Sequence, residues 1–313
     1  MRTAFIDELI AIAATDERVW LVTGDLGFSV LEPFADRFPE RYVNAGVAEQ
    51  NMVGVAAGLA RSGAHVFVYS IANFPTFRCL EQIRNDICYA RLSVTVVSVG
   101  SGFSYGSHGY THHAIEDLAV MRSLPGITVV SPGDPIEARR ATRALANLGR
   151  PAYLRLGKAG ETTVDGDGDT FRLGTMRLIR RGTDVTLIAM GSVLVTTVAA
   201  AAALSAQGIS ARVFSAHTLK PFDSGTLLEA LRETAGVVTV EEHRLVGGLH
   251  SAVGEAVIDA AERPPGIVRS IGVDPDATFG TGDQAYLRAA TGLTSDGIAN
   301  IAQGIVDHAR QRA

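Results

Sequence analysis

The alternation of short β-branched segments with helical segments constrains the fold of this chain more than any other feature. Four segments rich in Val, Ile, Thr and aromatic residues end in Gly, Ser, Pro or Asp, and they lie at 19–25, 65–70, 92–100 and 126–132. Apolar residues recur at helical spacing between them, at 49–63, 78–91 and 134–149. Strands that alternate with helices predict an α/β fold with a doubly wound, mainly parallel sheet.

The same alternation begins again after a polar stretch. Residues 159–175 are rich in Gly, Asp and Thr, which is typical of a linker. Further strands are predicted at 184–192, 210–216 and 236–243. We therefore predict two doubly wound α/β domains, at 1–160 and 181–313, joined by a linker at 161–180. Either sheet could carry a site, because ligands of open α/β sheets bind beyond the carboxyl ends of the strands.

The composition argues against several classes of function. The net charge is −5 and no basic stripe occurs, so nucleic acid is not expected as the main partner. Cys79 and Cys88 fit neither a zinc site nor a disulfide framework, which indicates a reducing compartment. Residues 1–20 do not resemble a secretory signal, and no stretch of about 20 residues is apolar enough to span a bilayer. We expect a soluble cytoplasmic protein.

One carboxylate has unusual neighbours. Glu49 is the only charged residue in the segment NAGVAEQNMVGVAAGLA at 44–60, which is otherwise mostly small or apolar. Either this side chain is exposed at the start of a helix, or it is partly desolvated and held for a chemical purpose.

Aromatic and imidazole side chains follow two of the predicted strands. Ile71, Phe74 and Phe77 are spaced three apart, so they either pack in the core or form a wall on which a flat heterocycle stacks. The segment SHGYTHHAIED contains His108, His112 and His113. It could be a polar surface loop, a metal site, or a site of substrate binding and proton transfer, and we favour the last.

Two glycine-rich turns also follow strands, at 100–106 and 247–253. Neither has the spacing and the apolar helix of a dinucleotide-binding loop, and tight strand-to-helix turns explain them without a ligand.

Together these segments resemble the C-terminal part of transketolases and related thiamine-diphosphate enzymes. That part consists of a pyrimidine-binding domain followed by a transketolase C-terminal domain. The resemblance covers nearly the whole chain and rests on the segments GDLGFS, NAGVAEQNMVGVAAGLA, FPTFRCLEQIRNDICYA, GYTHHAIEDLAVMRSLPGITVVSPGDPIEA, AYLRLGK, DVTLIAMGS and VVTVEEHRLVGGLHSAVGEAV.

The resemblance implies a role for Glu49 in activating the cofactor. In this family the corresponding glutamate contacts N1′ of the aminopyrimidine of thiamine diphosphate, and by sharing a proton it helps the ring to deprotonate the thiazolium. Low local dielectric strengthens such a hydrogen bond. Phe74 corresponds to the aromatic residue that stacks on the aminopyrimidine, and Ile71 and Phe77 complete that pocket. The resemblance thus favours a carboxylate held for chemistry.

The resemblance also implies substrate contacts. His112 corresponds to a histidine that contacts a hydroxyl or carbonyl oxygen of the substrate. Arg155, Arg2 and, less closely, Ser29 correspond to residues that bind a sugar phosphate, for which an arginine fork is well shaped.

Two departures from the family pattern concern the substrate. His108 stands where transketolases have the aspartate that senses the C2-hydroxyl of the donor. Gly100 stands where they have a phosphate-binding histidine. We therefore hypothesise a modified acceptor, either unphosphorylated or from a specialised pathway.

A diphosphate site is missing from the sequence pattern. The only Gly-Asp-Gly triplet, within 166–169, lies in the predicted linker, and the first Asn after it is Asn300, so we interpret it as a turn. No metal ligands are predicted in this chain. The resemblance implies a split enzyme in which a separate N-terminal subunit holds the diphosphate and Mg²⁺, with two copies of each chain in a heterotetramer.

The leading hypothesis is the C-terminal subunit of a split transketolase-like enzyme that transfers a two-carbon ketol unit from a ketose donor to an aldose-type acceptor. The alternatives are the β subunit of a 2-oxoacid dehydrogenase and an acyloin-forming synthase of the same superfamily. A non-catalytic module is a further alternative, but it would have no use for Glu49 beside an aromatic wall.

Overall fold

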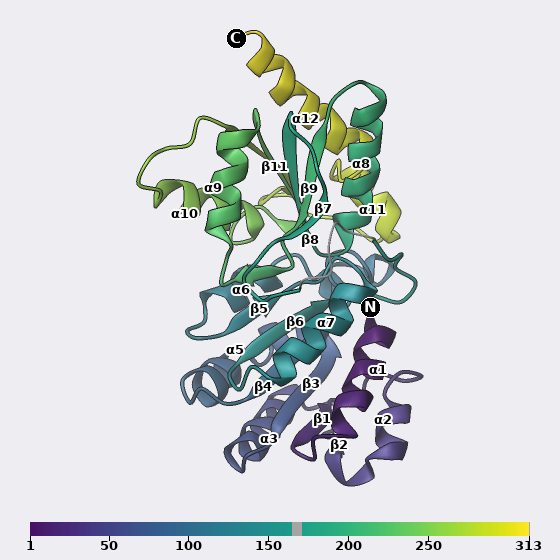
Figure 1. Cartoon of the computed structure of the whole chain (residues 1–313). Helices are drawn as coiled ribbons and strands as arrows, with labels where there is room; N and C mark the ends of the chain where they lie inside the picture. Colours follow the sequence, from purple (N-terminus) through teal and green to yellow (C-terminus); the bar gives the residue numbers. More distant parts are fainter. Residues whose placement is uncertain (165–170, 313) are drawn as a thin grey trace.

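Two α/β domains are stacked along the long axis of the molecule (Figure 1). The computed structural model describes residues 1–164 and 171–312, so the triplet at 166–169 lies outside the described residues. One sheet has seven strands in the order β10-β5-β6-β4-β3-β1-β2, and the other has five in the order β12-β11-β8-β9-β7. These two mainly parallel sheets with covering helices confirm the predicted fold class.

The seven-stranded sheet is parallel except at one edge, where β10 runs antiparallel to β5. Its strands are β1 (Val19–Thr23), β2 (Tyr42–Asn44), β3 (His65–Ile71), β4 (Val94–Val99), β5 (Thr128–Val130), β6 (Ala152–Leu156) and β10 (Thr218–Lys220). Strands β1, β3, β4 and β5 coincide with predicted segments. β2 was missed because three residues carry too little periodicity to distinguish a strand from a loop.

Helices cover both faces of this sheet, because side chains alternate between the faces along each strand. α1 and α7 lie on the face that carries Phe67 and Val97, and α3 lies on the face that carries Val66 and Val96. The helices and short turns are α1 (Arg2–Ala13), α2 (Glu32–Arg37), η1 (Pro39–Arg41), α3 (Glu49–Arg61), α4 (Asn73–Phe77), α5 (Leu80–Gln82), η2 (Ile83–Cys88), η3 (Gly106–His108), η4 (Tyr110–His112), α6 (Asp117–Ser123) and α7 (Pro135–Ala146).

The five-stranded sheet forms the second domain, with one antiparallel edge strand, β7. Its strands are β7 (Arg177–Arg180), β8 (Val185–Met190), β9 (Ala211–Ser215), β11 (Gly236–Arg244) and β12 (Ile267–Val273). Its helices and turn are η5 (Gly191–Val193), α8 (Leu194–Ala206), α9 (Ser224–Glu233), α10 (Leu249–Ile258), α11 (Gln284–Ala290) and α12 (Ser295–Arg310). β8, β9 and β11 were predicted, whereas β12 was missed and β7 lies in the stretch predicted as a linker.

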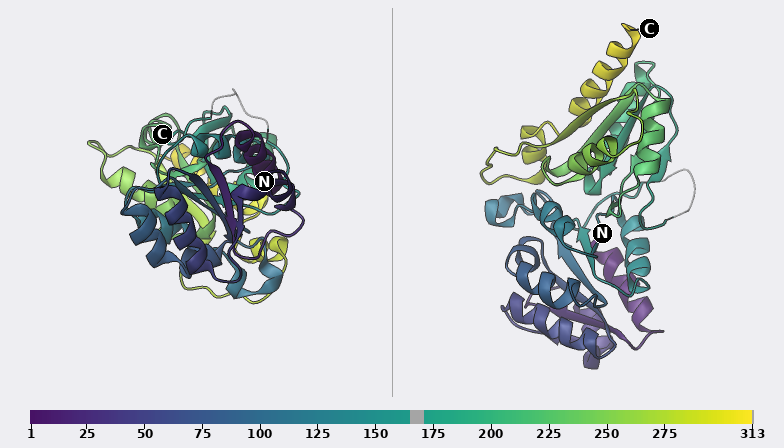
Figure 2. Two further views of the ribbon diagram at one scale, coloured as in Figure 1. Left: turned by 90° about the horizontal axis from the view of Figure 1, so that it is seen from below. Right: turned by 90° about the vertical axis from the view of Figure 1, so that its left-hand side faces the viewer.

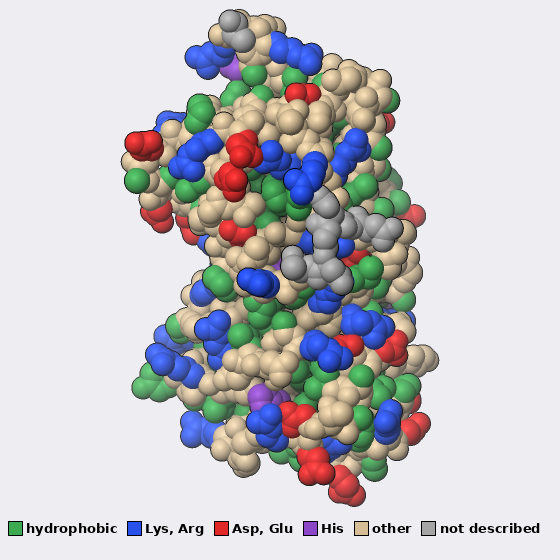
Figure 3. All heavy atoms as spheres, viewed as in Figure 1, with side chains coloured by type: hydrophobic (Ala, Val, Ile, Leu, Met, Phe, Trp, Pro, Cys, Tyr) green, Lys and Arg blue, Asp and Glu red, His purple; other side chains and the backbone are tan. Residues whose placement is uncertain are grey.

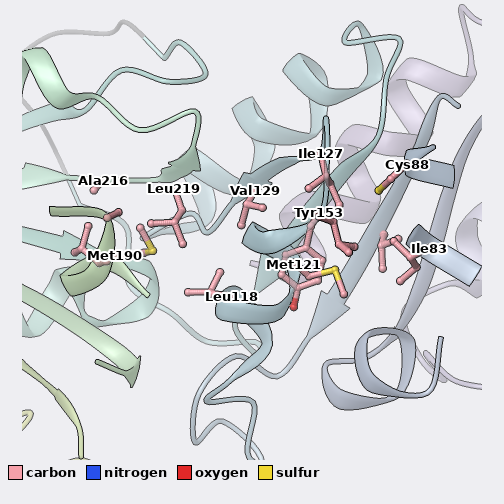
Figure 4. Close-up of a cluster of buried hydrophobic side chains, with 14 of the residues drawn as sticks. Ile83, Cys88, Leu118, Met121, Ile127, Val129, Tyr153, Met190, Ala216 and Leu219 are labelled. Carbon is pink, nitrogen blue, oxygen red and sulfur yellow. The ribbon is translucent and has the colours of Figure 1, made fainter. Parts of the chain in front are cut away.

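The second domain contributes a strand to the first sheet. Thr218 of β10 pairs with Val130 of β5, and the N–H of Ser131 donates to the carbonyl of His217 at 2.8 Å. Apolar side chains continue across this junction, from Met190 and Leu219 through Val129 to Ile83 (Figure 4). A shared strand and a shared core thus hold the two domains together. Figure 2 shows the two domains next to each other from two further directions.

The surface carries both signs of charge. On the face shown in Figure 3, Lys and Arg side chains are interspersed with Asp and Glu, and neither sign forms a continuous stripe. Within residues 1–164 and 171–312, no helix combines the length and the apolar character needed to cross a membrane.

Candidate active site

Some of the predicted site residues, Glu49, Phe74, His108 and His112, come together at the carboxyl edge of the first sheet. Glu49 begins α3 after β2, the aromatic residues follow β3, and the histidines follow β4. Strands β4, β3, β1 and β2 are consecutive neighbours in the sheet. Loops that leave parallel strands at the same edge lie close together, which is why residues far apart in sequence meet here.

Glu49 is buried and paired. Its side chain is 8% exposed, and Oε1 lies 2.6 Å from Nη1 of Arg78. Its place in the first turn of α3 puts the carboxylate at the positive end of the helix dipole. The backbone of Gly24 lies close to Glu49. A Cβ atom added to Gly24 would be 3.7 Å from Cγ of Glu49 and 3.4 Å from the carbonyl oxygen of Gly46. Glu49 is therefore a desolvated carboxylate in a tight seam rather than an exposed helix start.

Arg78 is the residue that the sequence analysis missed. Its guanidinium carbon lies 3.9 Å from the centre of the Phe74 ring, so one planar cation both stacks on the aromatic residue and pairs with Glu49. The available signal was an arginine one helical turn after an aromatic residue. That spacing is enough to predict the contact of Arg78 with Phe74, but it does not predict the contact with Glu49.

The three residues predicted to bind a flat ring differ in their exposure. Phe74 is half-buried and meets the ring of His112 edge-on at 5.5 Å. Ile71 ends β3 and is also half-buried, whereas Phe77 at the end of α4 is 42% exposed. Phe77 thus presents apolar area to the surroundings of the cleft instead of packing in the core.

A closed loop carries the histidines. Gly102 and Ala114 form an antiparallel bridge that closes the segment between them, and Nδ2 of Asn73 donates to the carbonyls of Thr111 and His113 at 3.1 and 2.8 Å. We call residues 102–114 the histidine loop. Because Asn73 precedes Phe74 in α4, these bonds fix the loop against the aromatic wall.

Two of the three histidines lie together, and one of them meets the Phe74 ring. The ring centres of His108 and His112 are 5.0 Å apart. Burial lowers the pKa of His112 below its ordinary value, and the nearby His108, Arg78 and His113 lower it further, so its imidazole is neutral near pH 7. His113 is buried, meets Phe103 edge-on at 5.3 Å, and has Nε2 3.3 Å from the carbonyl of Gly106, so it supports the loop.

No metal cluster occurs in the part of the chain that the structure describes, where no three His, Cys, Asp or Glu side chains are grouped to hold an ion. The metal interpretation of the histidine segment therefore has no support there.

Arg155 does not reach the cleft. It is 2% exposed, its Nε lies 2.8 Å from Asp117 Oδ2, and its Nη2 donates to the carbonyls of Ala114 and Glu242. The prediction that Arg155 binds a sugar phosphate is not supported by this geometry, because the guanidinium is engaged in a buried ion pair.

The other two residues predicted at a phosphate site differ from each other. Ser29 is exposed in a left-handed conformation with φ of 63°, and its N–H donates to Glu32 at 2.8 Å. Arg2 is half-buried, and its Nε is buried without a hydrogen-bond partner among the described residues. Arg2 is therefore the cation of this set with a buried N–H that no described residue accepts.

Tyr105 occupies the space beside Gly100. Gly100 has φ of +95°, and a Cβ built on it would overlap the Tyr105 ring. The Tyr105 ring is 5.8 Å from that of His108, and Nζ of Lys158 lies 5.5 Å from its centre. The Tyr105 ring therefore fills the space next to Gly100, the position that the resemblance aligns with a phosphate-binding histidine.

Comparison with known proteins agrees with this geometry. The profile described as "Transketolase, pyrimidine binding domain" matches residues 1–160, and that described as "Transketolase, C-terminal domain" matches residues 174–298. The fold and the site thus define a protein with the pyrimidine-binding half of a thiamine-diphosphate enzyme. The chain belongs to the transketolase family, as the sequence resemblance predicted.

Relatives of similar length indicate which kind of transketolase chain this is. The chain is 37% identical over 303 residues to an apulose-4-phosphate transketolase subunit of Phocaeicola vulgatus, covering 96% of each. It is 35% identical over 308 residues to a 6-deoxy-6-sulfo-D-fructose transketolase subunit of Clostridium sp., covering 98% of this chain and 94% of that one. A solved structure described as a split gene transketolase, inactive beta4 tetramer, is 36% identical with a TM-score of 0.87, covering 98% and 97%. The chain is a transketolase subunit of the type that carries the pyrimidine-binding and C-terminal domains.

Proposed function

We propose that this chain supplies the pyrimidine side of a thiamine-diphosphate site in a two-subunit transketolase, which moves a two-carbon ketol unit from a ketose donor to an aldose-type acceptor. The observation that carries the proposal is that one flat group, the Arg78 guanidinium, both pairs with the buried Glu49 carboxylate and lies over the face of Phe74. A flat, nitrogen-containing ring needs the same two partners: a carboxylate for its ring nitrogen and an aromatic face on which to stack.

The residues present fit an aminopyrimidine. The Arg78 guanidinium is itself a flat group with N–H donors, and it lies over Phe74 while donating to Glu49. It stands in for a ring that would make the same two contacts. Thiamine diphosphate, when bound, supplies the carbon nucleophile and electron sink for cleaving and forming bonds beside a carbonyl.

The side chains of this chain have separable roles in the proposal. Glu49 holds a proton at N1′ of the ring, and Ile71, Phe74 and Phe77 bind its faces. His112, neutral at pH 7, donates or accepts one hydrogen bond at a substrate oxygen. His108, whose ring centre lies 5.0 Å from that of His112, contacts the donor near its C2-hydroxyl.

The remainder of the site is assigned to a partner. We propose that a separate N-terminal subunit holds the diphosphate and Mg²⁺, and that two copies of each chain form a heterotetramer. Large apolar side chains are exposed in the loops after β1 to β4, namely Phe28, Val47, Phe77 and Tyr110. Exposed aromatic groups around a cleft are typical of a protein interface. We also propose a cytoplasmic location, which the two buried, unpaired cysteines support.

The substrate proposed is a specialised sugar rather than an ordinary sugar phosphate. Tyr105 takes the place of a phosphate-binding side chain at Gly100, and Arg155 is engaged by Asp117. The relatives from Phocaeicola and Clostridium are transketolase subunits for apulose-4-phosphate and 6-deoxy-6-sulfo-D-fructose. Arg2, whose Nε has no hydrogen-bond partner among residues 1–164 and 171–312, is the cation that we assign to an anionic end of such a sugar.

The decisive experiment uses the reconstituted two-subunit complex. Glu49→Gln should lower the turnover number by about 10²- to 10⁴-fold, because an amide cannot exchange the proton. Glu40→Gln, at an exposed position of η1, is the matched control and should match the wild type. A Glu49→Gln complex with wild-type turnover would mean that the chain is a non-catalytic module.

A further inference from the structure

A buried carboxylate of the second domain lies against the histidine loop of the first. Glu242 in β11 is 1% exposed, and its Oε1 accepts the backbone N–H of Phe103 at 3.1 Å. Its other donors come from its own domain: Nε2 of Gln284 at 3.0 Å, Nη2 of Arg288 at 2.7 Å and Oγ of Ser192 at 3.2 Å. One carboxylate thus ties three elements of the second domain to the backbone of the loop.

The fit at the base of the loop is close. Gly102 has φ of +60°, and a Cβ there would be 2.5 Å from Cγ and Cδ of Glu242. The same glycine exchanges two backbone hydrogen bonds of 2.9 Å with Ala114, which close the loop. Glu242 therefore contacts the loop at the point where its two ends meet.

A second contact supports the back of the loop. Phe279 meets Phe103 edge-on at 5.4 Å, and the Phe103 ring also meets His113. A Cβ on Gly106 would be 2.5 Å from the carbonyl oxygen of Gly282, so the backbones of the two domains are in contact there. Phe103, Ile115, Val273 and Leu287 enclose this contact in an apolar cluster.

The loop depends on such support because it has little structure of its own. His108 and His112 end η3 and η4, which are single turns of three residues. Short turns of this type have strained hydrogen bonds and do not hold a side chain in place by themselves. The bonds from Asn73 fix one side of the loop, and the second domain fixes the other.

We propose that Glu242, assisted by Phe279, is a positioning residue that sets His108 and His112 for the substrate. This inference rests on the proposed function, and it gives the C-terminal domain a part in substrate recognition. Glu242 makes no hydrogen bond to Glu49, Phe74 or Arg78. The predicted effect is therefore on substrate binding and transfer rather than on binding of the aminopyrimidine.

The test compares two neighbouring buried glutamates. Glu242→Gln keeps the shape of the side chain but removes the charge that faces Arg288, and Phe279→Leu removes the edge contact. Glu241→Gln is the matched control, because Glu241 accepts the N–H groups of Leu249 and His250 in its own domain. Hydrogen exchange of the full chain and steady-state kinetics of the two-subunit complex are measured for all three.

Glu242→Gln and Phe279→Leu should speed amide exchange in residues 102–114 and leave residues 49–61 unchanged. The KM for the sugar substrates should rise about ten- to hundredfold, since small misplacement of contact groups has effects of this size, while cofactor affinity stays as in the wild type. Glu241→Gln should lower thermal stability without changing exchange in the loop.

Wild-type exchange in the loop, or a wild-type KM, in the Glu242→Gln protein would overturn the proposal. An equal rise in exchange across the whole chain would do the same. A wild-type complex without thiamine-diphosphate-dependent turnover would instead contradict the proposed function, and the exchange measurement would still test whether Glu242 holds the loop.

Discussion

Nη1 of Arg78 lies 2.6 Å from Oε1 of Glu49, and the same guanidinium lies over the Phe74 ring. Both contacts are those that the transketolase resemblance assigns to an aminopyrimidine. An aminopyrimidine that binds to Glu49 must therefore replace Arg78 at the carboxylate and at the ring. Arg78 is half-exposed, so it has room to move outward.

Replacing Arg78 should tighten cofactor binding. Arg78→Gln removes a partly exposed ion pair and a cation–π contact, each worth roughly 0.5–1 kcal/mol, so the Kd for thiamine diphosphate should fall about 5- to 30-fold. Isothermal titration of the two-subunit complex measures the change. Arg84→Gln is the control, because the Arg84 guanidinium donates to the neighbouring Asn85 at an exposed position. Weaker binding by Arg78→Gln would show that Arg78 instead assists the cofactor.

The Arg155–Asp117 pair should govern stability more than phosphate binding. Both side chains are buried, and removing one partner leaves the other as an uncompensated charge. Arg155→Met should lower the free energy of unfolding by about 3–5 kcal/mol, as measured by urea denaturation. The KM for phosphorylated and unphosphorylated acceptors should change in parallel. A selective rise for the phosphorylated acceptor, with stability retained, would restore Arg155 as a phosphate ligand.

Tyr105 should restrict the acceptor. Tyr105→Ala removes the ring that fills the space beside Gly100, so larger acceptors and acceptors with a terminal phosphate should gain in relative kcat/KM. The measurement is the ratio of kcat/KM for a phosphorylated and an unphosphorylated acceptor of the same chain length. Tyr89→Ala, at an exposed position away from the histidine loop, is the control. An unchanged ratio would show that Tyr105 does not limit the cleft.

Buried His243 should make stability fall on acidification. Its Nδ1 lies 2.6 Å from the carbonyl of Arg244 and its Nε2 accepts from the N–H of Ala119, an arrangement of the neutral ring. Burial is the main cause that lowers its pKa to about 4; Asp117 opposes this shift and Arg155 adds to it. Because the folded pKa is depressed, this contribution is complete above about pH 6.5 and is lost as pH falls through about 4.

The contribution of His243 to the free energy of unfolding is about 3 kcal/mol, from the difference between its ordinary pKa of 6.5 and its pKa of about 4 in the folded protein. Urea unfolding at pH 7.5, 6, 5 and 4 measures it, and His243→Asn should have a shallower dependence than the wild type. His217, whose pKa burial lowers to about 3, accounts for part of the slope that remains. Equal slopes for the wild type and His243→Asn would exclude His243 as the source.

Much of the fold could be predicted because the apolar residues of its helices and strands recur at regular spacing along short segments of the sequence. The runs of β-branched residues at β3, β4, β8 and β11 are long enough to identify strands. The small residues around Glu49 left open whether its carboxylate is exposed or desolvated, and the family resemblance favoured the buried carboxylate that the structure has. The pairing of β10 with β5 could not be predicted, since three residues joined to a sheet across the domain junction leave no periodic pattern.

The candidate site was predictable in its residue types but not in its pairings. Glu49, Phe74 and His112 follow from family resemblance, whereas the Arg78 contact joins residues 29 apart along the chain. Arg155 has the sequence context of a phosphate ligand, yet Asp117 engages it from a different element. Glu242 lies in a segment that carries the family resemblance but had no visible partner, because its contact with Phe103 spans 139 positions.

The strand that β10 lends to the first sheet limits how this protein can be recombined. A hybrid that takes its first domain from one relative and its second from another must supply an edge strand that matches β5 in register and side-chain size. A fragment ending before Thr218 would leave β5 with unpaired backbone groups, which is the kind of edge along which chains aggregate. The two halves of this chain therefore have to be exchanged together, as a fitted pair rather than as interchangeable modules.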